Sequence, residues 1–420
     1  MKRLKGLLRR AVGLARATSD PTWLPVGEEF EARPSSGIVR FVLGVPEEFH
    51  QADGASITVS AGGLRSDPIP LARDGNGMLV GVHTHLLPDG PNRVEFALQV
   101  GGALKRRGWI DIEVSNPGPV AEQVRSSLKR RPGSLAFAGA CDASHYPYDD
   151  PEAAAWFDRP DALDAIARRE REGRIGADDA ALLRQFVEQG FVMLEGLIDE
   201  ALVDAVNREI DHAIADGYQG YTYGSSQRIE HLHQHHPNIR RLWLDPRHLR
   251  ILDLIYGVPG RPCQTLTYVF GSQQDPHQDT IHLTPFPAGF MSGTWIALQD
   301  VVPESGELVV YPGSHREPRV RMHDVGCPKV SGDWSEFGAK VVPEWARMCE
   351  RYSPMVYRPK KGTVLIWHEN LLHGGSVRRD TKLERRSLVI HSFAEGAIVY
   401  YDSSGMVGRT VDPAAAREGR

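Results

Sequence analysis

Short β-like runs separated by turn residues recur in two stretches of this chain, and they constrain its fold more than any other feature. In the first stretch, apolar or alternating runs span residues 37–43, 56–60, 78–85, 92–100 and 108–114. Turn-rich pieces such as DGNG at 74–77 and PDGPN at 88–92 divide them. About five strands with turn signals at intervals of roughly 10–20 residues predict a small β-sandwich. We place this domain at residues 30–120 and expect it to be immunoglobulin-like.

The second stretch begins with helices and ends with strands. Asp178 is expected to cap a helix that ends at Gly190, and Asp199 to cap another that closes at Gly217. A short strand is expected at 191–194, between these helices. Further β-like runs span 266–270, 293–298, 308–311, 363–367 and 387–393. Helices followed by many short strands predict a mostly β, α+β domain with a sandwich or jelly-roll core over residues 178–410.

The remaining parts of the chain are a linker and a basic N-terminus. Residues 121–177 are interpreted as a linker with helices, including a charged helix near 162–173, and 420 residues agree with two domains. Residues 1–20 are basic and amphipathic, which is typical of a helix that lies on an anionic membrane surface, of a solvated terminal helix or of a transit peptide. His83 and His85 alternate on one predicted strand, and we interpret them as half-buried structural residues. The N-terminal β-domain is therefore expected to be a binding or spacer module.

Charge and cysteine content exclude several classes of protein. With 49 Lys and Arg against 54 Asp and Glu, the net charge is −5, which argues against a nucleic-acid partner. The chain contains no apolar run of ~18 residues, so no transmembrane helix is predicted. Its four cysteines form no CxxC pair, which excludes a zinc ribbon and a thioredoxin-type motif. Only four cysteines in 420 residues indicate a reducing compartment. We therefore expect a cytoplasmic protein and leave open a peripheral membrane contact through residues 1–19.

The strongest local signal for chemistry is the tripeptide His277-Gln278-Asp279. If it lies in a strand, residues i and i+2 point to the same face, so the imidazole and the carboxylate project side by side. Such a pair supplies two of the three ligands in the 2-His-1-carboxylate triad of non-haem Fe(II) oxygenases. This triad leaves coordination positions open, which O2 and a co-substrate require.

A second histidine must then come from a distant strand. His373 is the preferred candidate because two glycines follow it and permit a tight turn beside a ligand. His368 in the same segment is the competing candidate. Farther along, Arg385 is preferred over Arg386 as a residue that could bind a dicarboxylate through a bidentate fork.

Other conspicuous side chains receive structural or surface interpretations. The cluster at 231–236 contains four histidines and is expected to form a solvated or substrate-facing loop, with a second metal site as the alternative. His315 is interpreted as a structural hydrogen-bonding residue. His391 is expected in the core or on the surface, with a position facing the pocket as the alternative. Tyr221 and Tyr223 are interpreted as packing residues, with stacking on a sugar ring as the alternative.

Several longer motifs occur in a fixed order between residues 180 and 400. They are LRQFVEQGFVML at 183–194, HQDT at 277–280, TWIALQD at 294–300, GEL at 306–308 with YPGSH at 311–315, KGT at 361–363 through LLHGG at 371–375, and RRSL at 385–388. This part of the chain, about half of it, resembles the phytanoyl-CoA dioxygenase family of Fe(II)- and 2-oxoglutarate-dependent oxygenases. The N-terminal β-domain lies outside the resemblance.

The resemblance implies a fold, a ligand set and a co-substrate site. The fold would be a double-stranded β-helix, which is a form of jelly roll. Fe(II) would be bound by the catalytic residues His277, Asp279 and His373, and Arg385 would bind the distal carboxylate of 2-oxoglutarate. Trp295 would line the pocket. Where many relatives carry a lysine, Tyr268 or Thr267 is expected to contribute to co-substrate binding.

The function that follows is an oxidoreductase, a 2-oxoglutarate-dependent dioxygenase that uses O2 and releases succinate and CO2. We expect it to hydroxylate a small polar or saccharide-type substrate, and a lipid-linked one is left open. The presence of Asp279 favours hydroxylation over halogenation, whereas epimerisation, ring formation and desaturation stay open. The alternative from a different class is a non-catalytic glycan- or partner-binding protein with a degenerate oxygenase scaffold.

Overall fold

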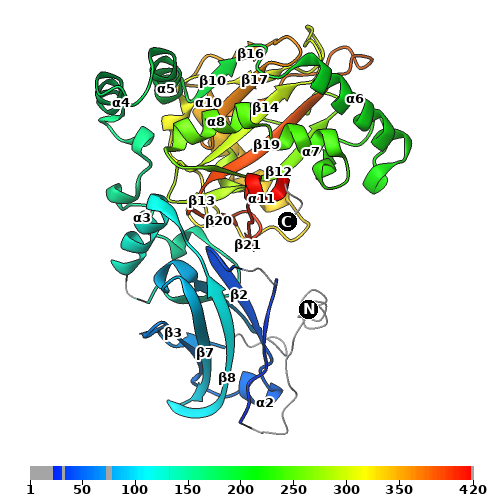
Figure 1. The fold of residues 1–420 in the computed structure, drawn as a ribbon. Coiled ribbons are helices and arrows are strands. Elements are labelled where there is room, and N and C mark those ends of the chain that lie inside the picture. The colour runs from blue at the N-terminus through cyan, green and yellow to red at the C-terminus, as the bar shows by residue number, and fades with distance from the viewer. Residues whose placement is uncertain (1–21, 31–33, 72–77, 132, 418–420) are drawn as a thin grey trace. The chain divides into compact units, whose positions relative to one another are not determined.

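The chain forms two compact units in a computed structural model (Figure 1). The structure describes residues 22–30, 34–71, 78–131 and 133–417. The first unit contains residues 1–153, 396–398 and 405–407, and the second contains residues 154–395, 399–404 and 408–420. The boundary at 153/154 falls inside the predicted linker. The predicted amphipathic segment 1–20 lies outside the described residues.

The N-terminal unit is built on two antiparallel sheets. One has the order β1 (Val26–Glu28), β2 (Ile38–Leu43), β6 (Met78–His83), β9 (Ala136–Ala138). The other has the order β4 (Leu64–Arg65), β3 (Ala55–Ala61), β7 (Gly90–Val100), β8 (Ala103–Val114), with β5 (Ile69–Pro70) paired to β3. The rings of Phe41 on β2 and Phe96 on β7 lie 5.3 Å apart, so buried side chains of the two sheets meet.

Each of the predicted N-terminal runs overlaps one of these strands, namely β2, β3, β6, β7 and β8. The immunoglobulin-like strand order stays a prediction. His83 and His85 do not alternate on one strand, because β6 ends at His83 and His85 lies in the 3₁₀ turn η1 (Thr84–Leu86). Both are fully buried rather than half-buried, and both meet backbone carbonyls, those of Ser134 and Gly396. They are structural residues, as expected.

The other elements of this unit are α2 (Glu47–His50), α3 (Gly118–Lys129), η2 (Ala143–His145), η3 (Pro151–Ala153) and β21 (Met406–Val407).

The C-terminal unit has a large antiparallel sheet that faces a smaller one. The large sheet has the order β10 (Phe191–Leu194), β17 (Val364–His368), β14 (Met291–Ala297), β19 (Ser387–Ala394), β12 (Gly260–Tyr268), β11 (Ile229–Glu230). The small sheet has the order β16 (Met355–Tyr357), β15 (Leu308–Val310), β18 (His373–Gly375). A further strand, β20 (Ile398–Tyr401), pairs with β13 (Thr284–Phe286). The expected mostly β, jelly-roll fold with helices is therefore confirmed.

The core of this unit fills the space between the two sheets. Strand alternation sends every second side chain of the large sheet inward. Trp295 of β14 and Trp367 of β17 belong to the same buried cluster as Leu308 and Tyr357 of the small sheet. The rings of Trp295 and Tyr357 lie 5.9 Å apart. Burial on both faces explains why the predicted strands appear as nearly continuous apolar runs.

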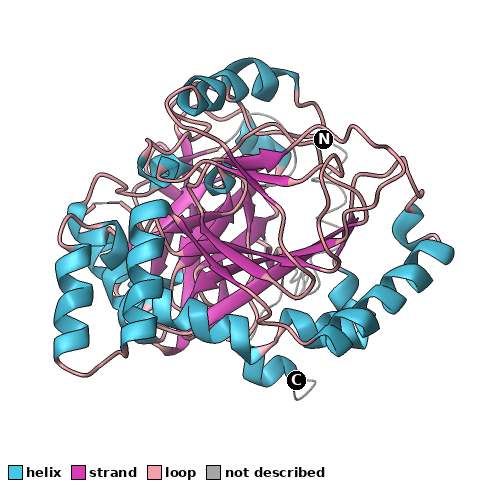
Figure 2. Ribbon diagram, turned by 90° about the horizontal axis from the view of Figure 1, so that it is seen from above, coloured by secondary structure: helices cyan, strands magenta, loops and turns pink. Residues whose placement is uncertain are grey.

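Helices surround the strands of this unit (Figure 2). They are α4 (Ala162–Arg171), α5 (Ala177–Gln189), α6 (Glu200–Ala215), α7 (Pro237–Trp243), α8 (Pro246–Tyr256), α9 (Ser335–Lys340), α10 (Val342–Cys349) and α11 (Pro413–Arg417), with 3₁₀ turns η4 (Trp156–Asp158), η5 (Tyr218–Gly220), η6 (Leu232–Gln234), η7 (Asp279–Ile281) and η8 (Ser314–Arg316). Gly190 ends α5 in the left-handed region with φ 82°, as predicted. Gly176, not Asp178, is the N-cap of α5, because the helix starts at Ala177 and Asp178 lies in its first turn. Asp199 is the N-cap of α6, as expected.

Among the described residues, no helix is long and apolar enough to cross a bilayer.

Gly293 makes room for the indole of Trp367 in the large sheet. It pairs with Trp367 across β14 and β17. A Cβ atom at Gly293 would lie 2.3 Å from Cε2 of that indole, so the ring of Trp367 occupies the space that any side chain at position 293 would need.

Gly293→Ala is therefore expected to lower the free energy of unfolding by about 1–3 kcal/mol, the usual cost of overpacking a core. Urea unfolding measures the loss. Gly338→Ala is the matched control, since Gly338 lies in α9 with open space around its Cβ position. Alanine is the better helix former, so this control should not destabilise the protein. Equal midpoints for Gly293→Ala and the unsubstituted protein would contradict the close packing.

Candidate metal centre

The three predicted ligands His277, Asp279 and His373 lie close together at one end of the core, but not because two of them share a strand, as the sequence had suggested. His277 and Asp279 do not lie in a strand: His277 forms an isolated antiparallel bridge with His373, and Asp279 begins η7. The backbone N–H of His277 donates to the carbonyl of His373 at 2.9 Å, and the reverse bond is 3.2 Å long. This backbone pairing places the two histidines side by side, and the turn at Asp279 directs its carboxylate toward them.

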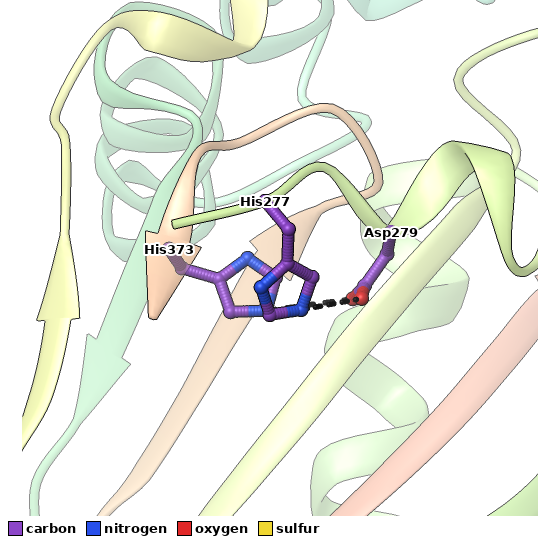
Figure 3. A group of neighbouring side chains, drawn as sticks. All are labelled: His277, Asp279 and His373. Carbon is purple, nitrogen blue, oxygen red and sulfur yellow. Dashed lines mark ion pairs between the residues drawn. The ribbon is translucent and has the colours of Figure 1, made fainter. Parts of the chain in front are cut away.

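The ligand atoms of these three residues lie close together (Figure 3). One donor atom from each side chain can be chosen so that all lie within 4.8 Å of one another. His277 Nε2 is 3.6 Å from Asp279 Oδ1, and His373 Nε2 is 3.7 Å from Asp279 Oδ2. Two nitrogens and one carboxylate oxygen are the donor set of the facial triad for Fe(II), so these residues fit that metal.

Backbone carbonyls fix the orientation of both imidazole rings. His277 Nδ1 lies 2.9 Å from the carbonyl oxygen of Asp275, and His373 Nδ1 lies 2.9 Å from that of Leu371. A carbonyl oxygen only accepts, so each Nδ1 carries the hydrogen. The lone pair of each neutral ring is then on Nε2, the atom that faces Asp279.

Burial and mutual contact set the charges of the three groups. Burial opposes ionisation of Asp279, but the neighbouring His373, His277 and His391 outweigh it and hold the pKa of this carboxyl well below its usual range. Burial lowers the pKa of His373 to about 4. Burial acts in the same direction on His277, yet the contact with Asp279 outweighs it and raises the pKa of His277 above its ordinary value. At neutral pH the site therefore offers an ionised carboxylate and a neutral His373.

The glycines after His373 allow the two ligand segments to approach each other. A Cβ atom at Gly374 would lie 2.8 Å from the carbonyl oxygen of Gln274, and one at Gly375 would lie 2.7 Å from the backbone nitrogen of Gln273. The expected tight turn at these glycines is wrong, because both lie in the strand β18, and they are needed instead for close backbone contact.

The triad opens into a cavity of about 540 Å³ that also contains Arg385, Trp295 and Tyr268. Only 2 % of Arg385 is exposed. Its Nε donates to the carbonyl of Gly306 at 3.1 Å and its Nη1 to Ser387 Oγ at 2.6 Å. Burial lowers its pKa to about 10, so the guanidinium stays charged at neutral pH. Among the described residues no carboxylate lies within 4.0 Å of it, which leaves a buried cation suited to an anionic ligand.

The competing candidates lie elsewhere. His368 neighbours Trp367 on β17 and so points to the opposite face, where its Nε2 lies 3.1 Å from Asp158 Oδ1. Arg386 pairs with Asp211 and Glu384 rather than lining the cavity. Thr267 is buried and is not a cavity-lining residue.

The histidine cluster at 231–236 does not contribute to the cavity lining. The expectation of a solvated or substrate-facing loop is wrong for His233, which is buried against Trp243 with Nδ1 2.8 Å from Thr265 Oγ1. His315 is structural as expected, with Nε2 3.1 Å from the carbonyl of Val187. Tyr223 donates to Glu384 at 2.6 Å and also lies outside the cavity lining.

His391 occupies the pocket-facing position that the sequence left only as its alternative to the core or the surface. It lines the cavity, and its Nε2 lies 3.6 Å from Asp279 Oδ2. The available signal was strand alternation, because His391 follows inward-facing Val389 by two residues on β19.

Two further groups of cavity residues were missed. One is a chain of ring contacts that leads from His277 through His282, Trp345 and Phe337 to Trp334. The other is polar and consists of Gln227, Arg228, Gln264, Ser272, Gln274 and Asp275.

Comparison with known proteins gives similarity over this same unit. Residues 186–387 match the family model described as phytanoyl-CoA dioxygenase (PhyH). The curated phytanoyl-CoA dioxygenase domain-containing protein 1 of Mus musculus is 28% identical over 182 residues, which are 42% of this chain and 60% of that protein. The Rattus norvegicus protein of the same description is 30% identical over 156 residues, 36% of this chain and 51% of that protein. The matched regions thus span only about half to three fifths of these relatives.

Solved structures with a similar fold are enzymes described as non-haem and α-ketoglutarate dependent, or crystallised with 2-oxoglutarate. The carbocyclase SnoK from nogalamycin biosynthesis is 18% identical with a TM-score of 0.46, covering 57% of this chain and 95% of its own. EctD from S. alaskensis, solved with 2-oxoglutarate and 5-hydroxyectoine, is 20% identical with a TM-score of 0.41, covering 55% of this chain and 80% of its own.

Acidification is expected to weaken metal binding at this centre. The pKa of His277 lies above its ordinary 6.5, so in mildly acidic solution a metal must displace a proton from this ring. Below that pKa the apparent affinity for Zn(II) should fall by up to about tenfold per pH unit, and above it the affinity should level off. Zn(II) titrations between about pH 6 and about pH 8 measure this, with His373→Ala as the check that the signal reports this site. Equal affinities across that range would contradict the assignment.

Proposed function

Residues 186–387 belong to the phytanoyl-CoA dioxygenase family, and on this premise we propose that the chain is an active Fe(II)- and 2-oxoglutarate-dependent hydroxylase. The family match and the His–Asp–His group confirm the predicted cofactor set of Fe(II), 2-oxoglutarate and O2. One observation carries the proposal for this chain: the three metal donors line the same cavity as the buried Arg385, which forms no salt bridge within the described part of the chain. An intact donor set beside such a cation does not favour the non-catalytic alternative.

In this proposal each site residue has a defined task. His277, Asp279 and His373 hold Fe(II), and Arg385 binds the distal carboxylate of 2-oxoglutarate. When bound, Fe(II) with 2-oxoglutarate and O2 supplies the oxidation of a substrate C–H group to C–OH, with release of succinate and CO2. Trp295 and Tyr268 lie against Arg385, with its guanidinium carbon 5.5 and 5.9 Å from their ring centroids, and they keep that end of the cavity dry.

The substrate is proposed to be a small polar molecule of the saccharide type. Two different walls of the cavity support this. The aromatic group ends at Trp334, which is 51 % exposed and offers a flat surface to a ring. The polar group supplies amide and hydroxyl partners, including Gln227, Gln274 and Ser272. A sugar ring has one apolar face for stacking and hydroxyl groups for hydrogen bonds, so it matches both walls.

The co-substrate site can be tested without knowing the substrate. Anaerobic addition of 2-oxoglutarate to the Fe(II)-loaded protein should produce a weak visible charge-transfer band. The band should vanish in His373→Ala and weaken strongly in Arg385→Ala, because the first loses a metal donor and the second the carboxylate partner. Arg386→Ala is the matched control, since that arginine pairs outside the cavity, and it should keep the band. A folded, Fe(II)-loaded protein without a band would contradict the proposal.

The substrate class is tested by succinate release in the presence of methyl glycosides, amino sugars and sugar phosphates. At least one should raise the rate above the basal value. Trp334→Ala should then raise its KM about fivefold, corresponding to about 1 kcal/mol of stacking, with little change in kcat. Trp109→Ala, at another exposed tryptophan, is the control. Stimulation by open-chain polyols alone, or an unchanged KM in Trp334→Ala, would contradict a stacked sugar ring.

A further inference from the structure

Trp367 contacts two of the three residues assigned to the metal. Its indole Nε1 donates a hydrogen bond of 2.8 Å to Asp279 Oδ2. Its ring also lies against the ring of His373, with the centroids 4.5 Å apart. Nothing in the sequence motifs gave this tryptophan a role. Its side chain reaches the centre because Trp367 and His368 point to opposite faces of β17.

The position of the indole is tightly constrained. Trp367 is fully buried in the middle of the large sheet, where it pairs with Phe191 on one side and Gly293 on the other. The ring lies over Gly293, where a Cβ atom would be 2.3 Å away. The N–H group therefore has little freedom to leave the carboxylate.

The hydrogen bond makes the two oxygens of Asp279 different. Each oxygen lies near one ligand histidine, Oδ1 3.6 Å from His277 Nε2 and Oδ2 3.7 Å from His373 Nε2, but Oδ2 alone accepts the hydrogen bond from Trp367. A carboxylate can bind a metal through one or both oxygens, and an N–H donor on one of them favours binding through the other.

We propose that Trp367 is a positioning residue that holds Asp279 as a one-oxygen ligand of the metal. With two histidines and a single oxygen, the centre keeps the open positions that a co-substrate and O2 require. A carboxylate free to bind through both oxygens would fill one of them. This inference rests on the proposed function of the site and adds to it a residue outside the ligand set.

Trp367→Phe removes the N–H donor while keeping an aromatic ring. Co(II) is the probe, because its visible spectrum reports the ligand arrangement and it does not depend on turnover. The dissociation constant for Co(II) should rise about 10–100-fold, the usual effect of losing an outer-shell partner, and the spectrum should change. Trp156→Phe is the matched control: it loses an indole hydrogen bond of the same length, 2.8 Å to the carbonyl of Ile255, away from the cavity. Its Co(II) affinity should stay within about twofold of the unsubstituted value.

The possible results separate this inference from the proposed function. The metal site is supported if the unsubstituted protein binds Co(II) and His373→Ala does not. If, in addition, folded Trp367→Phe binds Co(II) with the same affinity and spectrum as the unsubstituted protein, the role of Trp367 is overturned. If the unsubstituted protein does not bind Co(II), both fall together. Should Trp367→Phe fail to fold, β-(3-benzothienyl)alanine at position 367 has a sulfur in place of the N–H at nearly the same ring size. It should give the same weakened affinity and altered spectrum, and unchanged binding would overturn the proposal.

Discussion

The backbone pairing between the segment of His277 and the segment of His373 is the constraint on which the rest of the site depends. Four backbone hydrogen bonds join these segments. The N–H groups of His277 and His373 each donate to the carbonyl of the other, at 2.9 and 3.2 Å, the N–H of Thr280 donates to the carbonyl of Glu369 at 3.1 Å, and the N–H of Gly375 donates to that of Gln274 at 3.0 Å. The segments run antiparallel, so one register places both imidazoles at the same level. A register shift of one residue would turn His373 away from Asp279. The glycines at 374 and 375 are needed because the chains approach too closely for side chains.

A buried charge network fixes the same segments from the side away from the cavity. Glu369 is fully buried, and its Oε1 accepts from Arg319 Nε at 2.8 Å and from the backbone N–H of Gly289 at 2.9 Å. Arg319 also donates to Asp158 at 2.8 Å. Burial opposes the charge of Asp158, yet His368 and Arg319 outweigh it and lower its pKa. Removing Arg319 would leave the fully buried carboxylate of Glu369 without its charged partner, which is costly, so the network ties the distal histidine segment to η4.

Local sequence patterns predicted most strands of this protein because burial on alternate or on both faces leaves a readable periodicity. They also selected three side chains that the structure brings together, although the reason given for His277 and Asp279 was a strand that does not exist there. Turns and an isolated β-bridge produce no repeating pattern of apolar residues in the sequence. Only the types of these residues and their order along the chain therefore indicated the metal centre. Trp367 received no role, and a pocket-facing His391 was only the alternative, because the roles of both residues depend on which neighbouring strands surround them. Strand alternation could have placed Trp367 and His391 on the inner face of the large sheet. It could not have shown that both lie beside Asp279.

The charge balance of the cavity bears on which substrate it can accept. Among the described residues that line it, Arg228 and Arg385 are cations and Asp275 and Asp279 are carboxylates, so these side chains cancel. In the proposed complex the two positive charges of the metal and the two negative charges of 2-oxoglutarate also cancel. Arg385 is then occupied, and Arg228 is already paired with Glu230 at 2.9 Å. An acyl-CoA would bring several phosphate charges that no free cation in this lining could balance, at a large desolvation cost. An uncharged polar molecule incurs no such cost, which is why the electrostatics and the aromatic wall favour the same class of substrate.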